Sequence, residues 1–133
     1  MSSAQGRFIS PIHSAAGKTI LAFLDEQTRE TILTSSDWTP MTAHSITSRD
    51  QLLKELDSVR ERGYALDLEE NEIGVHCVAA PVFNANNHIQ AAVSISGPSV
   101  RMTEERIHSE LISLIRSEAD SISQSIGSHQ PQS

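Results

Sequence analysis

The sequence is short of aromatic side chains and of positive charge, and both shortages bear on nucleic-acid binding. Phe, Trp and Tyr make up 4 % of the 133 residues, so few large surfaces are available on which bases or sugars stack. Ten Lys and Arg stand against seventeen Asp and Glu, for a formal net charge of -7. Binding to DNA or RNA needs a basic stripe that replaces condensed counterions, and the scattered cations form none. We therefore expect no direct contact of this chain with nucleic acid.

Long apolar runs and pairs of cysteines are also missing. The apolar runs are as short as residues 19–24, whereas a membrane span needs about 20 apolar residues. Residues 1–7 contain no signal-peptide core. Cys77 is the only cysteine, so no disulfide can form within the chain, which fits a reducing compartment. These features predict a cytoplasmic protein without membrane contact.

Four segments carry helical patterns. The first covers residues 19–24, and the small residues before it could begin the helix. Its inward face is expected to consist of Ile20, Leu21, Phe23 and Leu24. The second covers residues 25–35. A third helix begins at the capping box Ser48-Arg49-Asp50-Gln51 and stops at Gly63. Thr103 caps a long C-terminal helix that Gly127 closes. Its apolar stripe consists of Ile107, Leu111, Leu114, Ile115, Ile122 and Ile126.

Strand patterns occupy 64–68, 75–83 and 88–96, with a turn at 84–87. Strands joined by short connections and flanked by helices predict an α+β fold with an antiparallel sheet. We expect one domain over residues 1–127 and a disordered polar tail over 128–133.

The period-two pattern sorts the hairpin strands into two faces. The aliphatic face of the return strand needs cover, for which the C-terminal helix is the candidate; it carries Ile89, Ala91, Val93 and Ile95. The other face is small and partly polar, with Ala92, Ser94 and Ser96, and Val75 and Cys77 share one face of the partner strand. Two interpretations stay open: the serines face water, as polar strand faces usually do, or they line a ligand pocket.

Cys77, His76 and Asp67 suggest nucleophilic catalysis, but their spacing argues against it. Neighbouring residues on a strand point to opposite faces, so His76 and Cys77 form no dyad. The six histidines are scattered without the spacing of metal ligands. We expect no enzymatic activity, no cofactor and no metal site.

Several motifs, in their order along the chain, resemble a known family. They are Gly6-Arg7, His13-Ser14-Ala15-Ala16-Gly17-Lys18-Thr19-Ile20-Leu21-Ala22-Phe23, Arg60-Glu61-Arg62-Gly63-Tyr64-Ala65-Leu66-Asp67, Glu69-Glu70-Asn71-Glu72-Ile73-Gly74-Val75-His76-Cys77-Val78-Ala79-Ala80-Pro81-Val82, and Ala91-Ala92-Val93-Ser94-Ile95-Ser96-Gly97-Pro98. Over about residues 6–127 the sequence resembles the C-terminal effector-binding domain of the IclR family of bacterial transcriptional regulators.

The resemblance implies a GAF-like α+β domain that binds a small metabolite, often an organic acid, and that forms dimers or tetramers. It implies that DNA is contacted through an N-terminal winged helix-turn-helix, which this sequence lacks. The helix and strands that precede Gly6-Arg7 in the family's effector domain are also missing from it, so the resemblance implies a partial domain with an incomplete sheet.

The resemblance also implies an effector site. Its matching positions are Ala15, Ala16, Asp67, Val75, Cys77, Ser94 and Ser96. Backbone N–H groups of the two alanines would form an anion-binding nest at a helix opening. Asp67 would accept a hydrogen bond from a ligand hydroxyl, or burial would raise its pKa. The acidic run 69–72 is expected to be a solvated connection with a structural role beside Asp67.

Two functions remain in competition. The first is a domain that senses an organic-acid-like effector, mediates oligomerisation and serves a transcriptional regulator. The second is a pure interaction module, in which an open sheet edge pairs with a second chain and no ligand binds.

Overall fold

The computed structural model describes residues 11–128. Helices α1 (Ala15–Phe23), α2 (Glu26–Ser35) and α3 (Arg49–Arg62) precede strands β1 (Ala65–Leu68), β2 (Val75–Phe83) and β3 (Ile89–Pro98). A continuous helical segment follows, made of α4 (Glu104–Arg106), a π-helical turn over Ile107–Leu111 and α5 (Ile112–Ser128). The strands form one antiparallel sheet in the order β1-β2-β3. The predicted α+β class is confirmed.

Short polar side chains begin each helix because they accept hydrogen bonds from backbone N–H groups that lack a partner within the helix. The hydroxyl of Ser14 accepts from Gly17, that of Ser48 from Gln51 and that of Thr103 from Arg106. Gly63 ends α3 with a φ of 85°, a left-handed conformation that favours glycine. The starts predicted at Ser48 and Thr103 and the stop at Gly63 are therefore confirmed.

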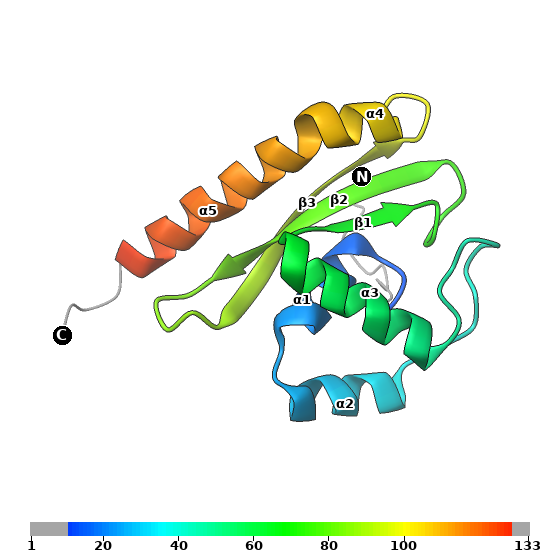
Figure 1. The fold of residues 1–133 in the computed structure, drawn as a ribbon, viewed down its shortest axis with the longest axis horizontal. Helices are drawn as coiled ribbons and strands as arrows, with labels where there is room; N and C mark the ends of the chain where they lie inside the picture. Colours follow the sequence, from blue (N-terminus) through cyan, green and yellow to red (C-terminus); the bar gives the residue numbers. More distant parts are fainter. Residues whose placement is uncertain (1–10, 129–133) are drawn as a thin grey trace, which may run out of the picture.

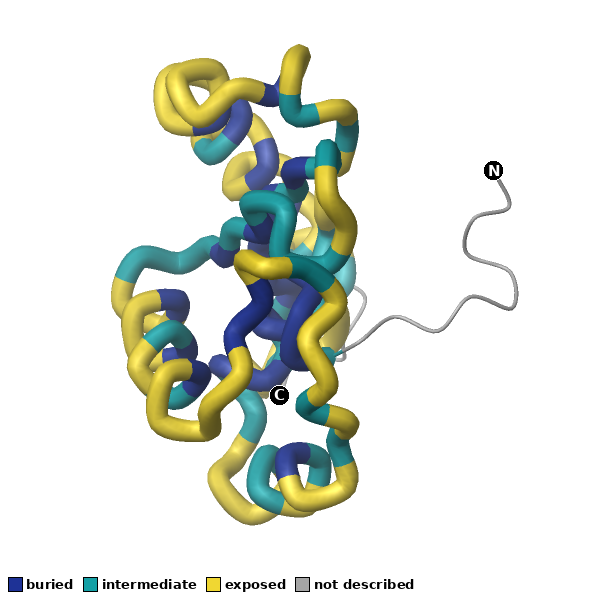
Figure 2. The backbone as a smooth tube through the Cα atoms, turned by 90° about the vertical axis from the view of Figure 1, so that its right-hand side faces the viewer, coloured by how far each residue is buried: buried dark blue, intermediate teal, exposed yellow. Residues whose placement is uncertain are grey.

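Helices cover both faces of the sheet (Figure 1). α1 and α3 pack on one face around a cluster that includes Leu21, Leu52 and Ala79. α5 packs on the other face, where Val78, Val82 and Ile115 meet. Figure 2 shows the buried backbone running through the interior of the molecule and the exposed residues along its outer sides. The C-terminal helix thus covers the aliphatic face at Val93 and Ile95, as predicted. Ile89 is an exception, because a register shift between Val82 and Phe83 places it opposite Phe83, on the α1 side of the sheet.

The predicted inward faces of two helices need correction. In α1 the buried residues are Ala15, Lys18, Thr19, Leu21 and Ala22. Ile20, Phe23 and Leu24 are only partly buried, because α1 contacts all three strands and turns its small residues toward them. In the C-terminal helix Leu114 and Ile122 are exposed, while Ala119 is buried. Three strands give too narrow a surface to cover the whole predicted stripe.

The ends of the chain add two smaller differences. α5 continues through Gly127 to Ser128, and β3 continues through Gly97 to Pro98. The Gly6-Arg7 motif and residues 129–133 of the predicted tail lie outside the described residues. Over residues 11–128, no helix combines the length and apolar character that crossing a bilayer requires.

Candidate functional site

Three of the predicted site residues form one row across the sheet. Asp67 of β1 lies opposite Cys77 of β2, and Cys77 lies opposite Ser96 of β3. Partners in antiparallel register point to the same face, and Cys77 packs against the cluster beneath α1. The row therefore faces α1. The next row, Ala65, Ala79 and Ser94, lies on the same face.

The first turn of α1 is held close to the segment before it. Ala15 is buried and Ala16 partly buried, and the Ser14 hydroxyl accepts from the N–H of Gly17 at 3.0 Å. A Cβ on Gly17 would lie 2.5 Å from the carbonyl oxygen of Pro11, so only glycine fits there. The N-terminal end of α1 carries the positive end of the helix dipole, and α1 as a whole packs against all three strands of the face that carries the row.

A buried lysine ties α1 to the loop after β1, and the sequence did not reveal it. The Nζ of Lys18 lies 2.8 Å from Glu70 Oε1 and 3.1 Å from Glu55 Oε2. It also donates to the carbonyl of Leu66 at 2.6 Å. The Lys18 side chain is fully buried, which a lysine tolerates only when it is paired.

The acidic run is therefore a structural element and not simply a solvated connection. Glu70 pairs with Lys18, and a carboxylate oxygen of Glu69 accepts from the N–H of Gly74 at 2.8 Å. The N–H groups of Glu70 and Asn71 donate to Asp67 Oδ1 at 2.8 and 3.2 Å. These contacts confirm the expected structural role beside Asp67.

Asp67 is buried, and burial raises the pKa of its carboxyl to about 6. The N–H groups of Glu70 and Asn71 and the charge of Lys18 lower it, while the charge of Glu70 raises it further. A carboxyl with this pKa changes its charge within about two pH units of neutrality, so it can accept from a hydroxyl or, protonated, donate to a carboxylate.

Cys77 is a poor nucleophile in this setting. Burial, and then the charge of Asp67, raise the pKa of its thiol to about 11, although a hydrogen bond with the Ser94 side chain lowers it. The thiol therefore stays protonated at neutral pH. His76 points to the other face, where its Nδ1 lies 2.7 Å from the carbonyl oxygen of Met102. The predicted separation of His76 and Cys77 is confirmed.

Ser94 and Ser96 share the face of Cys77, as their parity predicts, but both side chains are exposed. They lie on β3, whose other edge pairs with no strand among residues 11–128. Val75 is partly buried and pairs with Pro98 near the same end of the sheet. The register thus assembles the predicted strand residues on one face, open to water at its β3 side.

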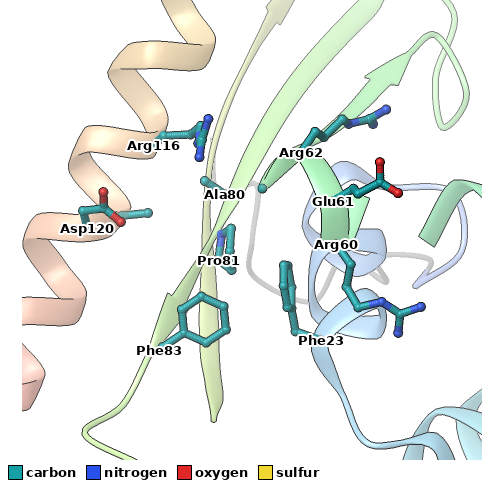
Figure 3. Close-up of a pocket in the computed structure, with 11 residues that line it drawn as sticks. Phe23, Arg60, Glu61, Arg62, Ala80, Pro81, Phe83, Arg116 and Asp120 are labelled. Carbon is teal, nitrogen blue, oxygen red and sulfur yellow. The ribbon is translucent and has the colours of Figure 1, made fainter. Parts of the chain in front are cut away.

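A separate pocket of about 270 Å³ lies between α3, β2 and α5, beside the end of α1 (Figure 3). Ala80, Pro81 and Phe83 form part of its wall, and Arg116 and Asp120 line it from α5. None of the seven predicted site residues lines this pocket. Among residues 11–128 no three His, Cys, Asp or Glu side chains gather as metal ligands would.

Residues 1–124 match the sequence profile of the family described as "Bacterial transcriptional regulator IclR C-terminal". The chain belongs to this family. Curated IclR-type relatives include the HTH-type transcriptional regulator KdgR of Dickeya chrysanthemi, 39 % identical over 121 residues, which are 90 % of this chain and 39 % of the relative. KdgR of Escherichia coli K12 is 40 % identical over 90 % of this chain and 46 % of its own length. The repressor AllR of the same strain is 37 % identical over 88 % of this chain and 43 % of its own.

Solved structures of IclR-type proteins share the fold. The C-terminal domain of E. coli KdgR superposes with a TM-score of 0.84 at 38 % identity, over 94 % of this chain and 76 % of that one. The Thermotoga maritima IclR gives 0.82 at 41 % identity, over 88 % and 47 %. The inducer-binding domain of PobR from Acinetobacter, a double mutant in complex with 3-hydroxybenzoic acid, gives 0.82 at 27 % identity, over 89 % and 67 %.

This IclR-type chain spans less than half the length of these curated relatives. The relatives are named as HTH-type transcriptional regulators and repressors. Sequence reasoning missed two of the structural supports of the site. The first is Lys18, whose ion pair could be inferred only from the acidic run at 69–72. The second is His13, to which the sequence assigned no role and which is buried with a hydrogen bond to the backbone of Ile46.

Proposed function

We propose that this chain is an effector-sensing domain that binds a small organic acid on the α1 face of its sheet and that it self-associates. The observation that supports this most is the row of Asp67, Cys77 and Ser96 on three neighbouring strands, on the face of the sheet that packs against α1. The row supplies an ionisable oxygen, a small apolar thiol and a hydroxyl within one patch.

The chemistry of the patch favours an acid that also carries a hydroxyl or carbonyl group. The amides of Ala15 and Ala16 at the positive end of α1 suit a carboxylate. Asp67 suits a ligand hydroxyl when it is ionised. Val75 and Cys77 offer apolar walls, and the hydroxyls of Ser94 and Ser96 donate from the β3 side. The PobR complex supports this class, because a structural relative holds a hydroxylated aromatic acid.

Regulation of transcription would pass through DNA-binding regions that lie outside this chain. The relatives named HTH-type regulators are more than twice as long as the segment that matches. With a net charge of -7 and no basic stripe, this chain would contribute effector binding and assembly, and no contact with DNA.

A thermal-shift screen of 3-hydroxybenzoic acid and a panel of small carboxylates, keto acids and sugar acids tests the proposal. A ligand present at 100 times its Kd adds about 2.7 kcal/mol to the free energy of unfolding. The double variant Ser94→Ala/Ser96→Ala should lose most of this gain. The matched control Ser113→Ala/Ser117→Ala, on exposed positions of α5, should keep it. A panel without any stabilising acid, or a gain equal in both variants, would contradict the proposed site.

The pure interaction module is the second candidate. It is favoured by two exposed apolar residues of α5, Leu114 and Ile122, and by the outer edge of β3, which pairs with no strand among residues 11–128. A chain that self-associates but is stabilised by no acid of the panel would support this alternative. A chain that binds an acid as a monomer would support sensing alone.

A further inference from the structure

The charge of Lys18 acts on Asp67, but the hydrogen-bond donors of this lysine are already used. A lysine ammonium has three N–H donors and no acceptor. They point to carboxylate oxygens of Glu55 and Glu70, at 3.1 and 2.8 Å, and to the carbonyl oxygen of Leu66, at 2.6 Å. Because the Lys18 side chain is also fully buried, an acid bound on the α1 face gains no hydrogen bond from it.

Ionisation of Asp67 would upset the balance of charge around this lysine. Glu55 and Glu70 already form ion pairs with Lys18. The charge of Glu70 opposes a second negative charge on Asp67. An ionised Asp67 would therefore add a third carboxylate around one ammonium, and the carboxylate of an effector would add a fourth.

The remaining groups that face this site do not supply a charge near neutral pH. Cys77, opposite Asp67 on β2, has a thiol whose pKa is raised to about 11 by burial and then by the charge of Asp67. Ser96, the member of the row on β3, does not ionise. His13, in the segment before α1, has a pKa that burial lowers from 6.5. Above about pH 6.5 the charge of the site therefore changes at Asp67.

The two carboxyl oxygens of Asp67 have different surroundings. The N–H groups of Glu70 and Asn71 donate to Oδ1 at 2.8 and 3.2 Å. Both hydrogen bonds that Asp67 accepts within the described part of the chain go to this oxygen, so Oδ2 is the oxygen that can carry a proton. Burial raises the pKa of the carboxyl to about 6, so protonating Oδ2 near neutral pH takes little free energy.

We propose that Asp67 binds the effector as a neutral acid, with the Oδ2 hydroxyl donating to a carboxylate or keto oxygen of the effector. This inference rests on the effector site proposed above and specifies which ligand group Asp67 recognises. Above about pH 6, the proton comes from solvent, and one enters the site with each acid bound. Two carboxyl groups at hydrogen-bond distance hold a proton between them because both cannot be ionised there. The resulting O–H···O⁻ hydrogen bond is charge-assisted and therefore strong.

The alternative is an ionised Asp67 that accepts from a hydroxyl of the effector, and it differs in the sign of the pH dependence. A neutral donor binds the acid more weakly as the pH rises above 6, whereas an ionised acceptor binds it more weakly as the pH falls. Asp67→Asn separates the two cases as well. Its amide oxygen can take the place of Oδ1, and its amide N–H can donate from the place of Oδ2.

Isothermal titration calorimetry of the full chain measures this coupling, with 3-hydroxybenzoate and with the acid of the panel that stabilises the chain most. Carboxylic acids of this kind are ionised from about pH 6.5 to about pH 8, so the carboxylate of the effector keeps its charge. The Kd should rise at least about ten-fold over this range, as the uptake of one proton requires. Titrations near pH 7.5 in two buffers of different ionisation enthalpy should show the uptake of more than half a proton per acid bound.

The variants should respond in opposite ways. Asp67→Asn should have a Kd that hardly changes with pH, and near pH 8 it should bind about ten-fold more tightly than the unmodified chain. Asp120→Asn, on an exposed position of α5, is the matched control and should keep the pH dependence. Circular dichroism would show that each variant is folded, and the proton count on the unmodified chain needs no substitution.

The outcomes separate this inference from the proposed function. A Kd that does not vary with pH, the release of protons on binding, or the loss of binding by a folded Asp67→Asn chain would overturn the neutral Asp67 and leave the effector site intact. If no acid of the panel binds at any of these pH values, the proposed function fails, and the inference fails with it.

Discussion

The Nζ of Lys18 in α1 lies 2.8 Å from a carboxylate oxygen of Glu70, in the loop after the strand that carries Asp67. This pair, with Glu55 and the Leu66 carbonyl, fixes the position of α1 relative to the loop that hydrogen-bonds Asp67.

We expect Lys18→Met to lower the free energy of unfolding by about 3 kcal/mol, since it leaves two carboxylates without their shared cation. Urea unfolding measures the loss. Lys54→Met, on an exposed position of α3, should change stability by less than about 0.5 kcal/mol; equal effects of the two variants would refute the structural role of Lys18.

Asp67 makes stability depend on pH in a defined direction. Its pKa is raised from 3.8 to about 6 in the folded chain, so between these values the folded state binds more protons than the unfolded state. The contribution of Asp67 is therefore most favourable below pH 4 and is lost as the pH rises through 6. The full change amounts to about 3 kcal/mol. Relative to Asp67→Asn, the unmodified chain should lose stability between pH 4 and pH 7, measured by urea unfolding in a pH series. A constant difference over this range would contradict the raised pKa.

The thiol of Cys77 should react slowly with alkylating reagents. A thiol pKa of about 11 leaves, relative to an ordinary cysteine, about 300-fold less thiolate near neutral pH. Iodoacetamide labelling followed by mass spectrometry should therefore be at least 100-fold slower than for Ser113→Cys, introduced on an exposed position of α5 in a Cys77→Ser background. His76→Gln should not alter the rate, because His76 lies on the other face. Fast labelling of Cys77 in the folded chain would refute its burial against α1.

Gly17 should be required for the close approach of α1 to Pro11. An added Cβ would lie 2.5 Å from the Pro11 carbonyl oxygen, so we expect Gly17→Ala to cost about 1–3 kcal/mol in stability. Gly127→Ala is the matched control, because a Cβ there meets no atom within 4 Å. In a helix it should be neutral or stabilising by up to about 1 kcal/mol. Thermal unfolding of the two variants measures the difference in stability. A Gly17→Ala protein as stable as Gly127→Ala would contradict the close packing of Gly17 against Pro11.

Local features of the fold were predictable because local chemistry determines them. The hydroxyls of Ser48 and Thr103 lie where orphan backbone donors need acceptors, and Gly63 lies where the chain needs a positive φ. The two faces of the hairpin followed from the alternation of its residues, except at Ile89, which a register shift turns to the other face. The row of Asp67, Cys77 and Ser96 did not, since its register depends on how many residues the 69–74 connection takes up. The sequence predicted which residues share a face on each strand, but not which residues lie opposite one another.

Two features were hidden because they depend on tertiary surroundings. Lysine is almost always exposed, so no pattern around Lys18 indicates that two carboxylates and a carbonyl would enclose it. The C-terminal stripe showed which face of the helix is apolar, but its periodicity says nothing about how wide the sheet beneath it is. That width leaves Leu114 and Ile122 uncovered.

The site proposal is tested most directly by an NMR titration of the isotope-labelled chain with the best stabilising acid of the panel. The account predicts saturable shifts of the backbone amides of Ala15 and Ala16, together with those of Cys77 and Ser96. The amide chemical shifts of Arg116 and Asp120, which line the pocket in Figure 3, should not change. Shifts confined to that pocket, or an acid that moves the β3 amides without moving those of Ala15 and Ala16, would contradict an effector site on the α1 face of the sheet.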